Sequence, residues 1–202
     1  MKTKTEAKRL AILKAAAEVF RQTGFERASM AEIQKRVGGS KATLYNYFPS
    51  KERLFFEVMY QANEVELDTV VGSLENADTD LRSALLGFGA QFLRFAYTPE
   101  AIAIRRLAIA ESGNSDIGKM CFERATVPTE QRVSLFLRRA MKRGALRTCD
   151  PKHAAIHLLS LLESEYLQRI LFGVSTPPGP EAIKASVKRA VDAFLKGYSK
   201  EA

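Results

Sequence analysis

Apolar residues recur every three to four positions from one end of the chain to the other, which is the spacing of an amphipathic helix. Near the N-terminus, Ile12, Ala16 and Phe20 fall on one helical face, and Gly24 marks the end of that helix. The chain has no sustained alternation of apolar and polar residues and no Asn-Gly or Asp-Gly dipeptide, the patterns that predict strands and hairpins. The sequence therefore predicts an all-α protein.

Capping residues divide this pattern into about ten helices. Ser29 and Glu32 are spaced as a capping box at the start of the second helix. Thr98, Asp150 and Gly179 each precede a proline, which is favoured at the first position of a helix. The expected helices span residues 8–24, 29–38, 40–48, 50–72, 79–97, 99–112, 115–125, 128–143, 151–172 and 180–198, with a loop at the segment ENADTD.

The first three helices have the layout of a helix-turn-helix, in which two helices hold a third in the major groove of DNA. A tight turn at Gly38-Gly39-Ser40 separates the second helix from the third. In the third helix, Leu44 and Phe48 lie four residues apart and therefore share the face that packs on the other two. The opposite faces of that helix are left for polar residues.

Those polar residues suit contacts with a DNA duplex. Lys41 can donate to guanine, Asn46 can pair with adenine, and the methyl group of Thr43 can pack on that of thymine. The hydroxyls of Tyr45 and Tyr47 suit phosphate oxygens, which fix the register of a protein on DNA without specifying sequence. The alternative is a small helical bundle whose exposed tyrosines and lysines bind nothing.

The distribution of charge changes this picture. The chain carries 31 Lys and Arg against 23 Asp and Glu, for a net charge of +8. Residues 1–60 hold 12 of the basic and 6 of the acidic side chains, so most of the excess lies in less than a third of the chain. A concentrated positive surface suits a polyanion such as DNA, because neutralising phosphates releases counterions. The same charges could also form a solvated surface without a partner.

The segment SKATLYNYFPSKERLF, within the stretch from Ile12 to Leu54, closely resembles the DNA-binding domain of the TetR family of transcriptional regulators. The family core T-L-Y-x-Y-F-x-S-K is represented here by Thr43, Leu44, Tyr45, Tyr47, Phe48, Ser50 and Lys51. The resemblance implies phosphate contacts for Ser29, Thr43, Tyr47 and Lys51. It implies contacts with bases or the nearby backbone for Lys41, Ala42, Tyr45 and Asn46.

One position of the turn departs from the family pattern. The turn usually reads Gly-Val-Ser, whereas here it reads Gly38-Gly39-Ser40. Because glycine loses more backbone freedom on folding, we expect this change to weaken the turn by up to about 1 kcal/mol.

The resemblance divides the chain into a helix-turn-helix DNA-binding domain at residues 1–50 and a helical ligand-binding and dimerisation domain at residues 51–202. Within the second domain, the runs RRLAIAES, CFER and LRRAMKRGALRTCDP resemble the C-terminal domain of AefR-like and AcrR-like members. The family's activity implies a ligand-responsive transcriptional regulator, a repressor that a small molecule releases from its operator. Activation of transcription is the alternative, because the sequence does not encode the sign of the response. The helix at 50–72 would join the two domains.

The C-terminal helices carry enough apolar residues to enclose a cavity for a small-molecule effector. The candidates are Phe88, Phe92, Phe95, Ile104, Leu107, Met120, Phe122, Leu135 and Phe136. Each of them could instead fill the core of the domain. Arg105, Arg106 and Glu111 in the same region could select a charged ligand or lie at the surface.

The last two helices offer apolar stripes, and the resemblance implies that this pair packs against its symmetry mate as a four-helix bundle in a homodimer. The stripes consist of Leu158, Leu161, Leu162, Tyr166, Ile170, Ile183, Val187, Val191, Phe194 and Leu195. A two-fold dimer would bind a near-palindromic double-stranded operator with half-sites about 34–36 Å apart.

The sequence predicts no cofactor, metal or catalytic site. His153 and His157 have a spacing that a metal ion could use, but no second pair of ligands accompanies them. An enzyme built on these histidines or on Cys121, and a protein-interaction module without DNA affinity, are the alternative functions. Cys121 and Cys149 are the only cysteines and no apolar run is long enough for a membrane span, so a cytoplasmic protein is expected.

Overall fold

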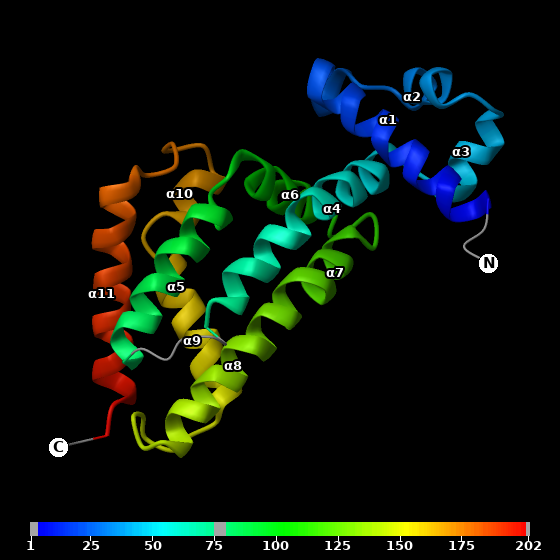
Figure 1. Cartoon of the computed structure of the whole chain (residues 1–202). Coiled ribbons are helices and arrows are strands. Elements are labelled where there is room, and N and C mark those ends of the chain that lie inside the picture. Colours follow the sequence, from blue (N-terminus) through cyan, green and yellow to red (C-terminus); the bar gives the residue numbers. More distant parts are fainter. Residues whose placement is uncertain (1–3, 75–79, 201–202) are drawn as a thin grey trace.

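The computed structural model (Figure 1) describes residues 4–74 and 80–200, and within these residues it is helical with no strand. The helices are α1 (Lys4–Arg27), α2 (Met30–Val37), α3 (Lys41–Tyr47), α4 (Lys51–Gly72), α5 (Leu81–Ala96), α6 (Pro99–Ala110), α7 (Ile117–Cys121), α8 (Val127–Lys142), α9 (Pro151–Glu163), α10 (Leu167–Leu171) and α11 (Pro180–Tyr198), with a π-helical turn, η1 (Phe122–Thr126), between α7 and α8. The all-α prediction is confirmed. The loop expected at ENADTD falls, except for its last residue, outside the described residues.

The three-helix unit, α1 to α3, is built around one apolar core. Leu44 and Phe48 of the third helix are buried, as their spacing predicted, and they join Ile12, Phe20 and Ile33 from the first two helices. Helix α1 bends at Gly24, whose φ of 75° favours glycine, so the regular part of α1 ends where the sequence predicted. In Figure 1 this unit stands apart from the larger helical body.

The larger body contains a second core, formed by α5, α8, α9 and α11 with the end of α4. Its tightest point is at Gly89 of α5. A Cβ atom at this position would lie 2.7 Å from a Val187 methyl carbon and 2.8 Å from a Leu162 methyl carbon. Glycine therefore lets α5 approach α9 and α11 closely. The C-terminus lies at the end of this body that is farthest from the three-helix unit (Figure 1).

Helix α4 belongs to both cores. Leu54, Phe56 and Val58 pack in the core of the three-helix unit, whereas Val70 and Val71 pack in the core of the body. The expected boundary at residue 50 therefore falls one residue before a helix that both parts share. A rotation or shift of α4 relative to either core moves the two parts relative to each other.

The helix caps agree with the sequence pattern in most places. Ser29, Ser40 and Ser50 each accept a hydrogen bond from a backbone N–H in the first turn of α2, α3 and α4. The capping box expected at α2 is only half formed, because the Glu32 carboxylate lies 3.3 Å from the Arg36 guanidinium one turn further along the helix. The i,i+4 ion pair replaces the reciprocal cap.

Two helix boundaries differ from the prediction. The helices expected at 115–125 and 128–143 form one nearly continuous rod, because η1 places Pro128 at the start of α8 without a break. The helix expected at 151–172 is instead divided, with α9 ending at Glu163 and α10 beginning at Leu167. None of the described helices is long and apolar enough to cross a membrane.

Candidate functional site

Helix α3 is anchored on one face and open on the other. The Ser40 hydroxyl accepts a 3.1 Å hydrogen bond from the Thr43 N–H and lies 2.9 Å from the Thr43 hydroxyl, which fixes the first turn. Leu44 and Phe48 hold the inner face, being 3% and 2% exposed. The residues on the outer faces are thus presented by a helix whose orientation the core determines.

The residues expected to contact DNA gather on that outer surface. Lys41, Ala42, Tyr45 and Asn46 are exposed, and Thr43 and Tyr47 are half-buried. Tyr45 is 38% exposed, and the Lys41 ammonium lies 5.6 Å from its ring centroid. A cation at this distance from an aromatic ring is attracted to the ring face. Both side chains are exposed, so a phosphate can approach the pair. The arrangement leaves donors and aromatic edges free on one side of α3.

Two further expected contacts lie beside α3. The Lys51 ammonium donates to the carbonyl oxygens of Phe25 at 2.9 Å and Glu26 at 3.3 Å, at the end of α1. An ammonium has three N–H donors, so one remains for a phosphate. Ser29 is exposed, and its oxygen accepts from the Glu32 N–H at 3.2 Å while its own hydrogen stays available.

The Gly-Gly turn before α3 is held by side chains. Gly38 and Gly39 have φ values of 69° and 95°, so both occupy a conformation that favours glycine. The Lys8 ammonium donates to the Gly38 carbonyl at 3.2 Å, and the Gln34 amide donates to the Gly39 carbonyl at 2.6 Å. These two hydrogen bonds offset the loss of stability that we expect from glycine at position 39, where the family usually has valine.

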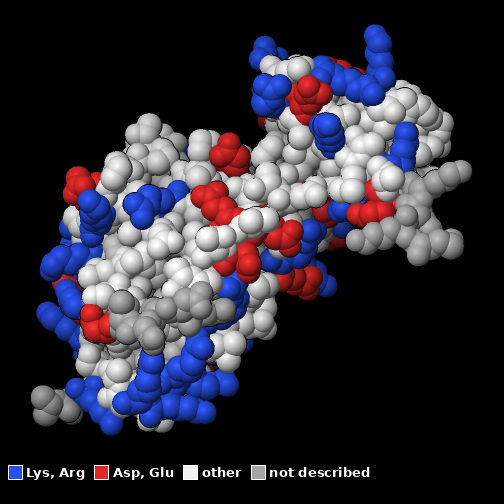
Figure 2. Space-filling view, in the orientation of Figure 1, with Lys and Arg blue, Asp and Glu red and all other residues white. Residues whose placement is uncertain are grey.

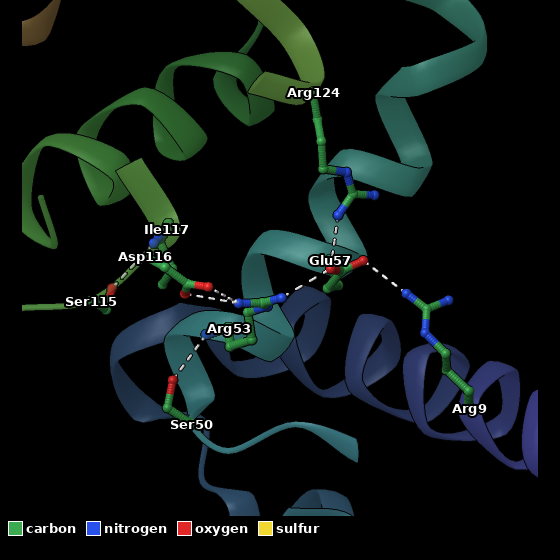
Figure 3. A network of polar contacts seen from close by, with 8 residues as sticks. All are labelled: Arg9, Ser50, Arg53, Glu57, Ser115, Asp116, Ile117 and Arg124. Atoms are coloured by element: carbon green, nitrogen blue, oxygen red, sulfur yellow. Dashed lines mark hydrogen bonds and ion pairs between the residues drawn. The ribbon is translucent and has the colours of Figure 1, made fainter. Parts of the chain in front are cut away.

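A network of ion pairs between side chains lies at the junction between the three-helix unit and the body (Figure 3). The Glu57 side chain is 9% exposed and accepts hydrogen bonds of 2.8 Å from Arg9 of α1 and 2.8 Å from Arg124 of η1. Arg53, one turn earlier on α4, lies 3.8 Å from the same carboxylate and donates to both oxygens of Asp116 at 2.8 Å. One buried carboxylate thus connects α1, α4 and η1.

A cavity of about 650 Å³ lies in the body, between α4, α5, α6, η1, α8, α9 and α10. This size is in the range typical of small-molecule sites. Four of the residues expected to line it do so, namely Phe92, Phe95, Ile104 and Phe122.

The other five expected cavity residues lie elsewhere. Phe88 and Phe136 are buried in the core of the body, and Leu107 and Met120 pack with the core of the three-helix unit. Leu135 is 52% exposed on α8, beside Arg138, Arg139 and Lys142. Because an apolar helical residue signals burial but not which space it borders, these five assignments are corrected.

Helix α4 contributes a wall of the cavity that the sequence analysis missed. Tyr60, Asn63, Glu64 and Leu67 all line it. They occupy positions i, i+3, i+4 and i+7, which is the signal of a common helical face, but three of the four are polar. The cavity therefore lies against the same helix that begins in the core of the three-helix unit.

Polar and charged side chains occur in several parts of the cavity wall. Arg105 of α6 and Glu163 of α9 form an ion pair of 2.6 Å in its wall. Tyr97 lies nearby, and burial, followed by the Glu163 carboxylate, raises the pKa of its phenol well above the usual value. Burial also raises the pKa of the thiol of Cys121 in α7, which likewise lines the cavity. The remaining wall is largely apolar.

The residues expected at a dimer interface divide into two groups. Seven are buried in the chain's own core and are therefore corrected as direct interface residues: Leu158, Leu162, Ile170, Ile183, Val187, Val191 and Phe194. Leu161, Tyr166 and Leu195 are half-buried and still have surface that a partner can contact. The apolar stripes of α9 and α11 thus pack on their own body.

The two histidines have separate partners. His153 lies 2.8 Å from the Asp150 carboxylate, and His157 contacts the Tyr198 hydroxyl of α11. Among residues 4–74 and 80–200, no three His, Cys, Asp or Glu side chains are grouped so that they could hold a metal ion.

Comparison with known proteins assigns the family. Residues 12–58 match the family model described as bacterial regulatory proteins of the tetR family. Residues 83–200 match the model of the AefR-like transcriptional repressor C-terminal domain. The chain belongs to the TetR family. It is therefore a DNA-binding transcriptional regulator and not an enzyme.

Individual TetR-family proteins resemble the chain over different lengths. The nucleoid occlusion factor SlmA of Haemophilus influenzae is 25% identical over 153 residues, which cover 74% of this chain and 68% of SlmA. The regulator RutR of Escherichia coli is 43% identical over 61 residues, or 30% of this chain and 29% of RutR. The strong local identity to RutR has the length of a DNA-binding domain.

Two solved structures match almost the whole chain. A TetR-family regulator from Mesorhizobium loti superimposes with a TM-score of 0.82 at 25% identity, covering 98% of this chain and 100% of that one. The Flavonoid-responsive Regulator FrrA superimposes with a TM-score of 0.72 at 31% identity, again covering 98% and 100%. The N-terminal helix-turn-helix and the C-terminal helical domain are shared with these relatives.

Proposed function

We propose that this TetR-family protein is a homodimeric repressor that a small molecule releases from a near-palindromic operator. In this proposal residues 1–50 bind DNA, and residues 51–202 bind the effector and the second subunit. The protein acts in the bacterial cytoplasm, where the chromosome is accessible to it. One observation carries the proposal, namely that α4 begins in the core of the three-helix unit and also lines the cavity of the body.

The DNA contacts are assigned to the open surface of the three-helix unit. Lys41, Ala42, Tyr45 and Asn46 on α3 contact bases or the nearby backbone. Ser29, Thr43, Tyr47 and Lys51 contact phosphates. The exposure of five of these residues and the partial exposure of Thr43, Tyr47 and Lys51 support this assignment, as does the anchoring of α3 by Leu44 and Phe48. The excess of positive charge in residues 1–60 supports it further, and Figure 2 shows Lys and Arg side chains over the three-helix unit.

The effector is assigned to the cavity of about 650 Å³. Phe92, Phe95 and Ile104 supply an apolar lining, and the Arg105–Glu163 pair supplies polar atoms that can orient a ligand. FrrA is described as flavonoid-responsive and is similar to this chain over 98% of its length. A flat, largely apolar molecule with a few hydroxyl groups, such as a flavonoid, fits this lining.

The dimer is assigned to the outer faces of α9 and α11. Leu161 of α9, Leu195 of α11 and Tyr166, which lies just after α9, retain surface while the remaining apolar residues secure both helices to their own body. The resemblance to the TetR family supports a four-helix bundle made from this pair and its symmetry mate. Two copies related by a two-fold axis present two α3 helices to adjacent turns of DNA.

The mechanism is a shift between two conformations. The ligand lowers DNA affinity only to the extent that it binds better to the conformation with wrongly spaced α3 helices. The direct test is a fluorescence anisotropy titration of duplexes from the DNA flanking the protein's own gene, at two salt concentrations, with and without the flavonoid naringenin. We expect salt-dependent binding that a cavity-bound ligand weakens. A ligand that demonstrably binds the cavity and leaves DNA affinity unchanged contradicts the proposal.

A further inference from the structure

Glu57 stands out because it is a buried carboxylate outside both the DNA-binding surface and the lining of the cavity. Its side chain is 9% exposed, and three guanidinium groups surround it. Removing one of these partners would leave part of a buried negative charge uncompensated, which is costly in free energy. The position of Glu57 therefore depends on the positions of the arginines. Its partners come from α1, α4 and η1, which are elements of both parts of the molecule (Figure 3).

One arm of this network reaches α3. The Arg9 guanidinium donates to Glu57 at 2.8 Å and lies 5.8 Å from the centroid of the Phe48 ring. Phe48 is the residue that ends α3 and is 2% exposed, so it has little freedom to move without its neighbours. A shift of Arg9 therefore changes the packing at the end of the helix that carries the DNA contacts.

The other arm reaches the cavity. Arg124 donates to Glu57 at 2.8 Å and belongs to η1, whose residues Phe122 and Ala125 line the cavity. The Arg124 guanidinium lies 4.0 Å from the centroid of the Tyr60 ring, and Tyr60 also lines the cavity. A molecule in the cavity that displaces Tyr60 or η1 must therefore move Arg124.

The backbone of η1 explains why this arm can respond. Pro128 has no N–H, so the carbonyl of Arg124, four residues earlier, has no helical donor at that position. The Tyr60 hydroxyl supplies one, at 3.0 Å. The Arg124 carbonyl is thus held by a hydrogen bond from the cavity wall where Pro128 cannot supply one, and a ligand that moves Tyr60 breaks that bond.

We propose that Glu57 is the positioning residue that couples the cavity to α3: it holds the three-helix unit in its DNA-binding orientation through Arg9, and cavity occupancy weakens that hold through Arg124. The inference rests on the proposed function and specifies how the cavity regulates DNA binding. Glu57 touches neither DNA nor ligand and acts through the two arginines. Loss of either arm has the same consequence as loss of Glu57 itself.

The test uses a defined occupant of the cavity. In a Cys149→Ser background, Cys121 is the one thiol of the chain and lines the cavity, so pyrene maleimide places a bulky ring there. The Cys121→Ser, Cys149→Ser protein, treated in the same way, is the unlabelled control. DNA affinity is measured by anisotropy on a duplex selected by the unlabelled protein from a random pool.

The proposal predicts about tenfold weaker DNA binding after labelling, within the usual range of allosteric coupling. In the Arg124→Gln protein the label should change DNA affinity by less than about twofold, because the Arg124–Glu57 ion pair that connects the cavity to Glu57 is already absent. Arg82→Gln removes an equal charge from an ion pair with Asp192 and leaves the response to the label intact. Thermal melts establish that each variant is folded.

The outcomes separate the inference from the proposed function. If the label leaves DNA affinity unchanged in the parent protein, the control of DNA binding by the cavity fails, and the inference fails with it. If the parent responds and Arg124→Gln responds equally, the cavity controls DNA binding by another route and the role of Glu57 alone is overturned.

A double-mutant cycle gives a second, label-free test. Arg9→Gln and Arg124→Gln break different arms of one carboxylate, so the double variant should bind DNA no more weakly than the weaker single variant. Arg9→Lys and Arg124→Lys keep the charge beside Glu57 and should restore most of the affinity. Effects of the two Gln substitutions that simply multiply contradict a shared route through Glu57.

Discussion

The Tyr60 hydroxyl donates a 3.0 Å hydrogen bond to the backbone carbonyl of Arg124, across the gap between α4 and η1. We expect Tyr60→Phe to lower the free energy of unfolding by about 1 kcal/mol, because that carbonyl loses its donor and Pro128 cannot replace it. Urea unfolding measures the change. Tyr45→Phe removes a hydroxyl from an exposed tyrosine and serves as the control, with an expected change within about 0.5 kcal/mol. Equal stabilities for the two variants contradict the role assigned to the Tyr60 hydroxyl.

Lys51 has both a structural and a DNA-binding role in this account. Lys51→Ala should weaken binding to all duplexes and reduce the slope of log affinity against log salt by about one unit, since one phosphate contact is lost. Binding titrations at several salt concentrations measure the slope. Lys184→Ala removes the same charge from the exposed face of α11 and should leave the slope unchanged. A normal slope for Lys51→Ala excludes a phosphate contact at this position.

Substituting alanine for two glycines of α5 should change the stability of the fold in opposite directions. At Gly89 the new methyl group meets Val187 and Leu162 at less than 3 Å, so Gly89→Ala should destabilise the fold by about 1–3 kcal/mol. At the exposed Gly87 no atom lies within 4 Å of the new methyl group, so Gly87→Ala should stabilise the helix by about 0.5–1 kcal/mol. Denaturant unfolding compares them directly. A neutral Gly89→Ala variant is incompatible with the close approach of α5 to α9 and α11.

Tyr97 predicts a pH dependence of stability. Its buried hydroxyl has no hydrogen-bond partner among the described residues, and burial and Glu163 raise the pKa of its phenol. Folding therefore favours the protonated form, so this contribution to stability is complete below the unfolded pKa of about 10 and declines as the pH rises above it.

The matching variant is Tyr97→Phe. At pH 7 its free energy of unfolding should lie between that of the parent and about 1 kcal/mol above it, because an unpartnered buried hydroxyl is removed. Above pH 10 it should lose stability less steeply than the parent, which urea melts at a series of pH values measure. An identical alkaline decline in both proteins shows that Tyr97 does not titrate as described.

The fold and the open face of α3 were predictable because local patterns determine them. The four-residue spacing of Leu44 and Phe48 specifies which face of α3 is buried, and the serine caps specify where α2, α3 and α4 begin. The surface of α3 then follows by exclusion. No long-range contact has to be known for this inference.

The lining of the cavity was predictable only in part, as were the faces left open to a second copy, because both depend on which surfaces meet. The stripe containing Leu158 and Val187 signals burial, but the same stripe serves equally to pack on the chain's own body or on a second copy. Tyr60 and Asn63 were missed at the cavity because polar residues on a helix suggest solvent. Glu57 pairs with Arg9, which is 48 positions away in the sequence, and with Arg124, which is 67 positions away. No local sequence pattern reveals such distant pairs.

The central claim is that the open face of α3 binds DNA, and the most direct measurement is the affinity of a Lys41→Ala, Asn46→Ala protein for its selected duplex. Lys184→Ala again removes one positive charge far from α3 and is the control. The account predicts that the α3 variant loses at least about tenfold in affinity for the selected duplex and much less for random DNA, because each base contact contributes about 1–3 kcal/mol of discrimination. Equal affinities of the α3 variant and the control for the selected duplex would contradict it.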